Sequence, residues 1–199
     1  MIESYQTLSN KGEALLTEKG SKFYSFALKA NSITMFEQRL NELEQQFSDS
    51  RHVCYAYRII DNGKVLENSH DAGEPSNTAG PPILGQITSA NLLNTMVVVV
   101  RYFGGIKLGT GGLIRAYREA AKLAIENAPQ LQEHVLASYT LFFSYEQTKL
   151  IEGLVQTFGL NITNKTFDSN CSYNVDVAVG QKKTFEERLN LEGIRFLTL

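Results

Sequence analysis

The residues with the clearest capacity for chemistry lie in one stretch, 96–121, with the sequence MVVVVRYFGGIKLGTGGLIRAYREAA. It begins as an apolar strand, passes through a glycine-rich turn and resumes as a helix. Backbone N–H groups at such a turn and at a helix N-terminus can bind an anion, and nearby basic side chains can neutralise it. The stretch therefore predicts an anion- or nucleic-acid-binding site. Its predicted members are Arg101, Gly104, Gly105, Lys107, Gly109, Gly111, Gly112, Arg115 and Arg118.

The glycine spacing excludes the two standard nucleotide-binding motifs. Thr110 stands where the phosphate-binding loop of nucleoside triphosphatases needs lysine. Ile114 stands where the dinucleotide fingerprint needs its third glycine. Glycines also permit positive φ and close packing of helix on strand, so a purely structural role is the alternative to an anion site.

A second group of polar residues lies in the turn-rich loop HDAGEPSNTAGPP, residues 70–82. His70, Asp71 and Glu74 are close enough in sequence to move protons or to contribute to a metal site, which makes them weak catalytic candidates. Three polar residues in a turn are commonly just a turn. His52 and Cys54 alternate on a strand, and a packed cysteine beside a histidine is favoured over a nucleophile or metal pair. No metal and no cofactor are predicted.

The elements that must position these residues follow from apolar periodicity. Residues 21–29 alternate as a strand does, and residues 33–47 carry an apolar stripe with the period of a helix. Asp61-Asn62-Gly63 predicts a hairpin turn. The predicted elements are strands at 3–8, 13–17 and 21–29, a helix at 32–47, strands at 52–60 and 64–68, a helix at 81–90, a strand at 97–102 and a helix at 113–127. Their order predicts an α+β sandwich in which one helical layer covers one sheet.

The pattern restarts after residue 128. Pro129 and the polar residues 130–134 predict a linker. Strands are predicted at 135–145, 160–167, 172–179 and 194–199, with helices at 146–158 and 184–190, and Gly159 is expected to end the first of these helices. This βαββαβ order is ferredoxin-like. The sequence thus predicts a domain at 1–128, a linker at 129–134 and a second domain at 135–199.

Composition limits the classes of function. The 199 residues are 43% hydrophobic and 20% charged, which is ordinary for a globular protein, and no run approaches the ~20 apolar residues that span a bilayer. Two distant cysteines argue against a disulfide framework and favour the cytoplasm. Residues 1–128 hold 13 basic and 13 acidic side chains, so an anion site must be a local patch, and the 101–118 segment is the candidate.

Two long motifs carry a family resemblance. DAGEPSNTAGPPIL at 71–84, followed by VVVVRYFGGIKLGTGGLIRAYREA at 97–120, resembles the YigZ/IMPACT family. The likeness covers about residues 15–127, and the remainder resembles the small C-terminal domain of bacterial members. Asn77 stands where glycine is usual, and Ala72 stands where a second aspartate is common, which weakens a metal interpretation further.

The resemblance implies a fold for each half. The first resembles the second domain of small-subunit ribosomal protein five, which glycine-loop kinases of the galactokinase group and a domain of elongation factor G share. The second is similar to the ferredoxin-like last domain of elongation factor G. Eukaryotic IMPACT is a translational regulator that competes for the Gcn-one activator of an eIF-two-alpha kinase, whereas bacterial members have no settled activity. Fold analogy alone is a weak warrant for function.

Three hypotheses follow. The favoured one is a non-enzymatic, translation-related factor that binds RNA or a ribosome-associated protein through the Arg/Lys-flanked glycine segment, with the C-terminal domain as a second surface. The second is an enzyme acting on a phosphorylated small molecule or a nucleotide, with Glu74 or Asp71 as base. The third is a protein-interaction module, which an exposed apolar patch on the sheet face opposite the helices would favour. In each case we expect the 71–80 loop to lie beside the glycine segment.

Overall fold

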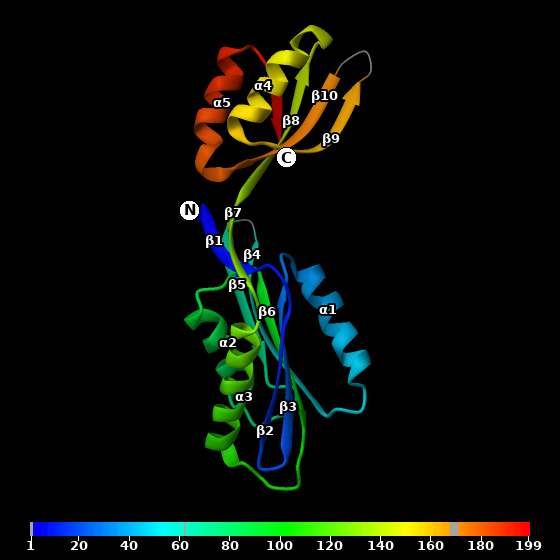
Figure 1. Ribbon diagram of the computed structural model, residues 1–199, viewed down its shortest axis with the longest axis vertical. Coiled ribbons are helices and arrows are strands. Elements are labelled where there is room, and N and C mark those ends of the chain that lie inside the picture. The colour runs from blue at the N-terminus through cyan, green and yellow to red at the C-terminus, as the bar shows by residue number, and fades with distance from the viewer. Residues whose placement is uncertain (1, 62, 168–170) are drawn as a thin grey trace. The chain divides into compact units, whose positions relative to one another are not determined.

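The computed structural model describes residues 2–61, 63–167 and 171–199. They form two compact units (Figure 1). The larger is Tyr5–Glu133, and the smaller joins the residues up to Ser4 with His134–Leu199. Among the described residues, no helix combines the length and the apolar character that crossing a membrane requires.

The larger unit is built on a five-stranded antiparallel sheet in the order β2-β3-β6-β4-β5. Its strands are β2 (Gly12–Glu18), β3 (Ser21–Lys29), β4 (His52–Asp61), β5 (Lys64–His70) and β6 (Thr95–Tyr102). The predicted hairpin between β4 and β5 is confirmed, with Asp61 opposite Lys64, although Asn62 of its turn lies outside the described residues. The apolar strand β6 is buried along its length because it is central in the sheet.

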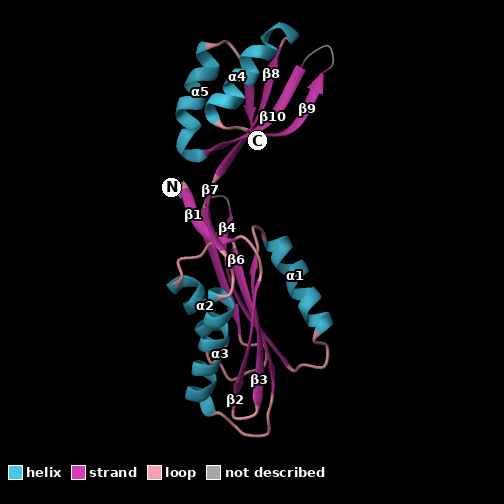
Figure 2. Cartoon of the chain, in the orientation of Figure 1, coloured by secondary structure: helices cyan, strands magenta, loops and turns pink. Residues whose placement is uncertain are grey.

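Helices cover both faces of this sheet (Figure 2). One face packs against α2 (Gly80–Ser89) and α3 (Gly109–Glu126), with Phe23, Ala27, Val97 and Val99 in the shared core. The other packs against α1 (Ile33–Gln46). The prediction of one helical layer was therefore wrong. Strands β3 and β6 are apolar at successive positions, so each presents apolar side chains to both sides and both faces need cover.

Two helix starts decide where the site residues lie. Ser32 caps α1 by accepting a hydrogen bond from the backbone N–H of Met35. Helix α3 begins at Gly109, four residues before the predicted start at residue 113. Gly109 has φ of +70°, which favours glycine, and it lets the chain turn directly into the helix. Of the five predicted loop glycines, only Gly104 and Gly105 precede the helix.

The predicted linker is a strand. Residues 130–134 form β7 (Gln130–His134), which pairs with β1 (Ser4–Leu8) in a two-stranded sheet. Just beyond β1, the backbone N–H of Ser9 donates to the carbonyl oxygen of Pro129 at 2.9 Å. The polar composition that suggested a linker also suits an exposed strand whose backbone groups are satisfied by a neighbour.

The smaller unit has the predicted ferredoxin-like βαββαβ order. Its four-stranded sheet runs β11-β8-β10-β9, with β8 (Leu136–Phe143), β9 (Asn161–Phe167), β10 (Cys171–Ala178) and β11 (Arg195–Thr198). Helices α4 (Thr148–Phe158) and α5 (Lys182–Leu191) pack against one face of it. Gly159 ends α4 in the left-handed conformation, with φ of +61°, as predicted.

Candidate functional site

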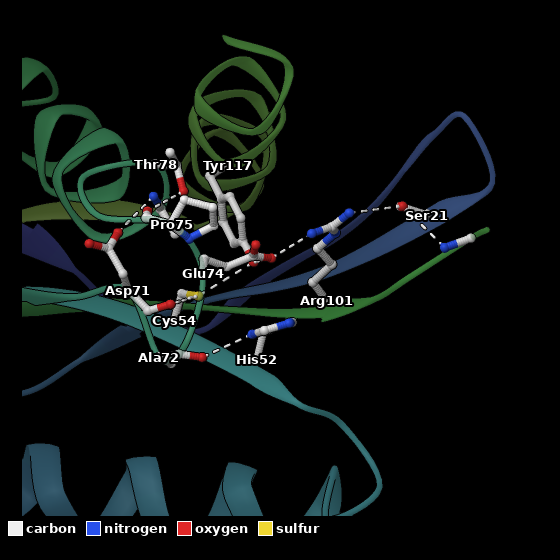
Figure 3. A network of polar contacts seen from close by, with 12 residues as sticks. Ser21, His52, Cys54, Asp71, Ala72, Glu74, Pro75, Thr78, Arg101 and Tyr117 are labelled. Atoms are coloured by element: carbon white, nitrogen blue, oxygen red, sulfur yellow. Dashed lines mark hydrogen bonds and ion pairs between the residues drawn. The ribbon is translucent and has the colours of Figure 1, made fainter. Parts of the chain in front are cut away.

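A buried polar cluster joins the two motifs that carry the family resemblance (Figure 3). Glu74, from the loop between β5 and α2, accepts hydrogen bonds on one carboxylate oxygen from Arg101 Nη1 at 2.7 Å and from the Tyr117 hydroxyl at 2.8 Å. Arg101 ends the buried part of β6 and Tyr117 lies on the inner face of α3. The expectation that the 71–80 loop lies beside the glycine segment is confirmed by these contacts.

The burial of this cluster favours a structural role over a catalytic one. The Arg101 and Glu74 side chains are 7% and 3% exposed, so their ion pair is desolvated and each charge depends on the other. Arg101 Nη2 also lies 3.4 Å from Ser21 Oγ, which accepts a hydrogen bond from the backbone N–H of Gly104. Glu74 is thus held by two donors, an arrangement that suits an ion pair better than a base that must exchange protons with a substrate.

The position of Arg101 corrects its predicted role. It was expected to neutralise an anion at the surface together with Lys107, Arg115 and Arg118, but it lies inside the fold and pairs with Glu74. The physical reason is the register of the sheet. Arg101 follows the run of buried valines on the central strand and shares a face with Val97 and Val99, which packs against α2 and α3.

The thiol of Cys54 borders the same cluster. Its sulfur lies 3.0 Å from the carbonyl oxygen of Asp71 and 3.4 Å from the Tyr117 hydroxyl. Burial raises the pKa of the Cys54 thiol to about 12, and the charges of Glu74 and Asp71 raise it as well. Burial also raises the pKa of Tyr117, and the neighbouring Cys54 and Glu74 raise it by a smaller amount. Both groups stay protonated near neutral pH, so Cys54 is a packed thiol and not a nucleophile.

The remaining candidates of the HDAGEP loop organise the start of α2. The Asp71 carboxylate accepts hydrogen bonds from the backbone N–H groups of Asn77, Ala79 and Gly80 at 2.7 to 2.9 Å. Burial by itself would raise the pKa of Asp71, but these three donors outweigh it and hold the pKa below its ordinary value. His70 Nδ1 accepts from the Ala72 N–H. Among the described residues, no group of three or more His, Cys, Asp or Glu side chains could hold a metal ion.

Three of the predicted basic residues are exposed. Lys107 precedes α3, and Arg115 and Arg118 lie on its outer face. Within the described part of the chain, none of the three forms an ion pair. The N-cap position of α3 is Leu108, which has no side-chain oxygen and makes no capping hydrogen bond. One exposed cation therefore precedes the helix N-terminus, which carries partial positive charge, and two more lie further along the outer face of α3.

The first turn of α3 and its arginines line a hollow of about 430 Å³ on the larger unit. Gly112, Arg115 and Arg118 contribute to it, and so do the acidic side chains of Glu18 and Glu119. A Cβ built on Gly111 would lie 3.6 Å from Arg115 Nη1, which places that guanidinium over the glycine turn. The hollow therefore brings two guanidinium groups together, while its two acids reduce the net positive charge.

The glycines of the 96–121 segment are present for different structural reasons. A Cβ on Gly104 would lie 1.8 Å from the carbonyl carbon of Gly20, so this glycine is required by the close approach of two backbones. Gly111 has room for a side chain. Close packing thus explains the glycine at position 104, as the structural alternative predicted. It does not explain Gly111, which is therefore a candidate for close approach of a ligand to the backbone.

Sequence reasoning missed two features of this region. Tyr117 was not among the predicted site residues, although a tyrosine on the apolar face of α3 needs a partner for its hydroxyl. Arg51 and Phe103 line a second pocket with His52, and neither motif nor periodicity singles out Arg51. The signal that could have found the ion pair is the arginine at the end of a run of buried valines, because a buried guanidinium requires an acid.

The fold and this cluster define a class of α+β protein. Its larger unit holds the motifs at 71–84 and 97–120 together by a buried Glu–Arg–Tyr cluster, and its smaller unit is ferredoxin-like. The Impact N-terminal domain matches residues 19–125. IMPACT family member YvyE of Bacillus subtilis is 34% identical over 146 residues, covering 70% of this chain and 67% of that protein. IMPACT family member YigZ of Escherichia coli is 30% identical over 173 residues, covering 86% of this chain and 84% of that protein.

A solved structure has the same fold. It is described as that of a hypothetical protein, and it matches 100% of this chain and 98% of its own with a TM-score of 0.75 and 25% identity. The chain belongs to the YigZ/IMPACT family, as its two motifs predicted.

Proposed function

We propose that this protein is a translation-related factor that binds structured RNA through the outer face and first turn of α3. The observation that carries the proposal is the set of exposed cations before and along α3, with a helix N-terminus whose N-cap residue, Leu108, makes no side-chain hydrogen bond; the cations are Lys107, Arg115 and Arg118. Family membership supports the link to translation, because eukaryotic IMPACT is a translational regulator as the resemblance implies.

The chemistry of the surface fits a phosphate backbone. Uncapped N–H groups at the start of α3 can donate to phosphate oxygens, and guanidinium groups can bind phosphate with two parallel hydrogen bonds. Contacts of this kind position a nucleic acid without reading its bases. Since Arg101 pairs with Glu74 inside the fold, three cations and not four are available at this surface.

The salt dependence of RNA binding tests the proposal. Neutralising three phosphates predicts a slope of log K against log salt of at most about −3. Fluorescence anisotropy with a labelled RNA hairpin, titrated at several salt concentrations, measures it. The double variant Arg115→Glu/Arg118→Glu should weaken binding and flatten the slope. The matched control Lys64→Glu/Lys183→Glu makes the same charge change at two exposed residues that belong to β5 and α5, and it should bind as the wild type does. A wild-type slope near zero would remove the proposal.

A protein partner is the second candidate, and one observation favours it. Ile106, next to Lys107 in the loop before α3, is 55% exposed, and a large exposed apolar side chain beside a cation suits a protein contact. The apolar sheet face that this hypothesis expected is covered by α1. Affinity capture from lysate with the wild type and with Ile106→Ser, reading both RNA and protein, separates the two partners. Loss of a captured ribosome-associated protein with unchanged RNA would favour the protein.

A further inference from the structure

Aromatic side chains line a groove at one end of the sheet face that α1 covers. The volume of the groove is about 440 Å³, within the range of ligand-binding sites. Its lining comes from β3 and the turn before it, from the end of α1 and from the end of β6. We call this site the aromatic groove, and its lining residues are Gly20, Lys22, Tyr24, Phe47, Tyr102 and Phe103.

The groove exists because α1 ends before the sheet does. Phe47, the C-cap residue of α1, packs against Tyr24 and Phe26 of β3, with ring centroids 5.7 and 5.5 Å apart. Two residues earlier in β3, where the helix has ended, Lys22 pairs with Tyr102, the last residue of β6. Lys22 is exposed, and Tyr24 and Tyr102 are half-buried. Aromatic surface is therefore left that a partner can cover.

The rings of the groove are not parallel to one another. The Tyr24 and Tyr102 rings have centroids 5.9 Å apart and planes at 85°, and the planes of Tyr24 and Phe47 meet at 35°. Phe103 adds a ring that is 57% exposed. Proline-rich segments dock in aromatic-lined grooves of this kind, and they lose little conformational entropy because polyproline II is already formed in the free peptide. The lining therefore suits proline side chains.

Charge favours a peptide over a nucleic acid as the occupant. Lys22 is the one charged side chain among the described residues that line the groove. It forms no ion pair within the described part of the chain. A nucleic acid would bring one phosphate per nucleotide to this single cation, and Asp49, which accepts a hydrogen bond from the Tyr102 hydroxyl, would repel phosphates nearby. A peptide can instead bring one acidic side chain.

We propose that the aromatic groove binds a proline-rich segment of a partner protein that carries an acidic residue beside its prolines. The prolines pack against the rings of Tyr24, Tyr102 and Phe103, and the acidic side chain pairs with Lys22. A peptide in the polyproline II conformation has no internal hydrogen bonds, so its carbonyl groups are free to accept from the Tyr24 hydroxyl.

Fluorescence anisotropy of the full chain with a labelled peptide tests the aromatic contacts. The probe is an oligoproline peptide that ends in glutamate. Replacing its prolines by alanines should weaken binding by roughly tenfold, because the peptide loses its preformed conformation. Phe103→Ala should weaken binding of the proline peptide by roughly tenfold. The matched control Phe167→Ala removes a ring of β9 that is 52% exposed, and it should bind as the wild type does.

A charge reversal tests the contact with Lys22. Lys22→Glu should weaken binding of the glutamate peptide by roughly threefold, the size expected for an exposed ion pair. It should strengthen binding of a peptide with lysine in place of glutamate by about the same factor, whereas a merely disturbed structure would lose both peptides. Lys64→Glu makes the same charge change at an exposed residue of β5 and should alter neither.

Four results would overturn the proposal. They are no binding of the proline peptide at millimolar concentration, equal binding of the proline and alanine peptides, wild-type binding by Phe103→Ala, and no exchange of charge preference in Lys22→Glu. Oligouridine that binds in a Phe103-dependent way, without binding of the proline peptide, would assign the groove to a nucleic acid instead. Both substituted side chains are exposed, and circular dichroism checks that each variant is folded.

The proposal does not rest on the RNA surface of α3, because the groove shares none of its basic residues. Arg115→Glu/Arg118→Glu should therefore leave peptide binding unchanged, and Phe103→Ala should leave the salt dependence of RNA binding unchanged.

Discussion

Replacing Glu74 by alanine should destabilise the larger unit by roughly 3–5 kcal/mol, because it leaves the buried Arg101 guanidinium without a counter-charge. The pair is 2.7 Å apart with both side chains almost fully buried. The same change also removes the acceptor of the Tyr117 hydroxyl, and a buried donor without a partner costs about 1–3 kcal/mol by itself. Both losses come from removing the same carboxylate oxygen, so their costs do not add. We expect a destabilisation in the upper part of the range of roughly 3–5 kcal/mol.

The chain offers a matched control at the surface. Arg58 Nε and Glu67 are also 2.7 Å apart, but the Glu67 side chain is 41% exposed. Glu67→Ala should therefore cost at most about 1 kcal/mol, since water replaces the lost partner. Equal distances with unequal burial isolate desolvation as the cause of the difference between the two variants.

The assay must report on the larger unit, because the chain has two units that can unfold separately. Urea denaturation followed by hydrogen exchange of peptides from β6 and α3 provides this. The double variant Glu74→Leu/Arg101→Met should recover much of the stability, since an apolar pair leaves no buried charge. A cost for Glu74→Ala that equals that of Glu67→Ala would refute the reasoning, and so would a double variant that is less stable than Glu74→Ala alone.

Three further predictions concern single residues of the larger unit. Cys54, whose thiol pKa is raised to about 12 by burial, should resist iodoacetamide at pH 8 in the folded chain and react in urea, as mass spectrometry would show. Asp71→Ala should cost about 1–2 kcal/mol at pH 7 as a lost helix cap. Because folding lowers the Asp71 pKa below 3.8, its contribution is present above that pH and is lost as pH falls through the folded pKa, so urea titrations of both proteins should converge in acid. Gly104→Ala should lower the stability of the folded chain by more than about 1–3 kcal/mol, because its Cβ would lie 1.8 Å from the Gly20 backbone. Gly111 has room for a Cβ, so Gly111→Ala should leave the melting temperature nearly unchanged.

Most of the fold could be predicted from local patterns. The alternation of residues 21–29, the Asn-Gly hairpin, the Ser32 cap and the helix stop at Gly159 all depend on neighbours in sequence, and the structure has each of these features. The wrong predictions were those that depend on partners far away. The second helical layer, the pairing of β7 with β1 and the earlier start of α3 each require knowledge of what packs against the segment.

The candidate site, like the fold, could be predicted only in part from the sequence. The motifs at 71–84 and 97–120 were enough to identify the family and to predict that the two segments are adjacent, because their residue types and order are specific. Which basic side chains face solvent was not accessible from the sequence, since the exposure of a side chain depends on its register against the layers above and below it. Arg101 and Arg115 are equally basic in sequence, yet the sheet buries the first against Glu74 and α3 exposes the second.

The sequence by itself therefore determined the order of most elements, the family and the existence of a basic, glycine-rich segment, because these follow from residue type and short-range periodicity. The tertiary structure alone decided that the segment splits between a buried Glu74–Arg101–Tyr117 cluster and an exposed face of α3. It also brought Arg51, His52 and Phe103 around one pocket. The physical reason is that an ion pair, a pocket and a desolvated charge are properties of groups that only folding brings within a few ångströms of one another.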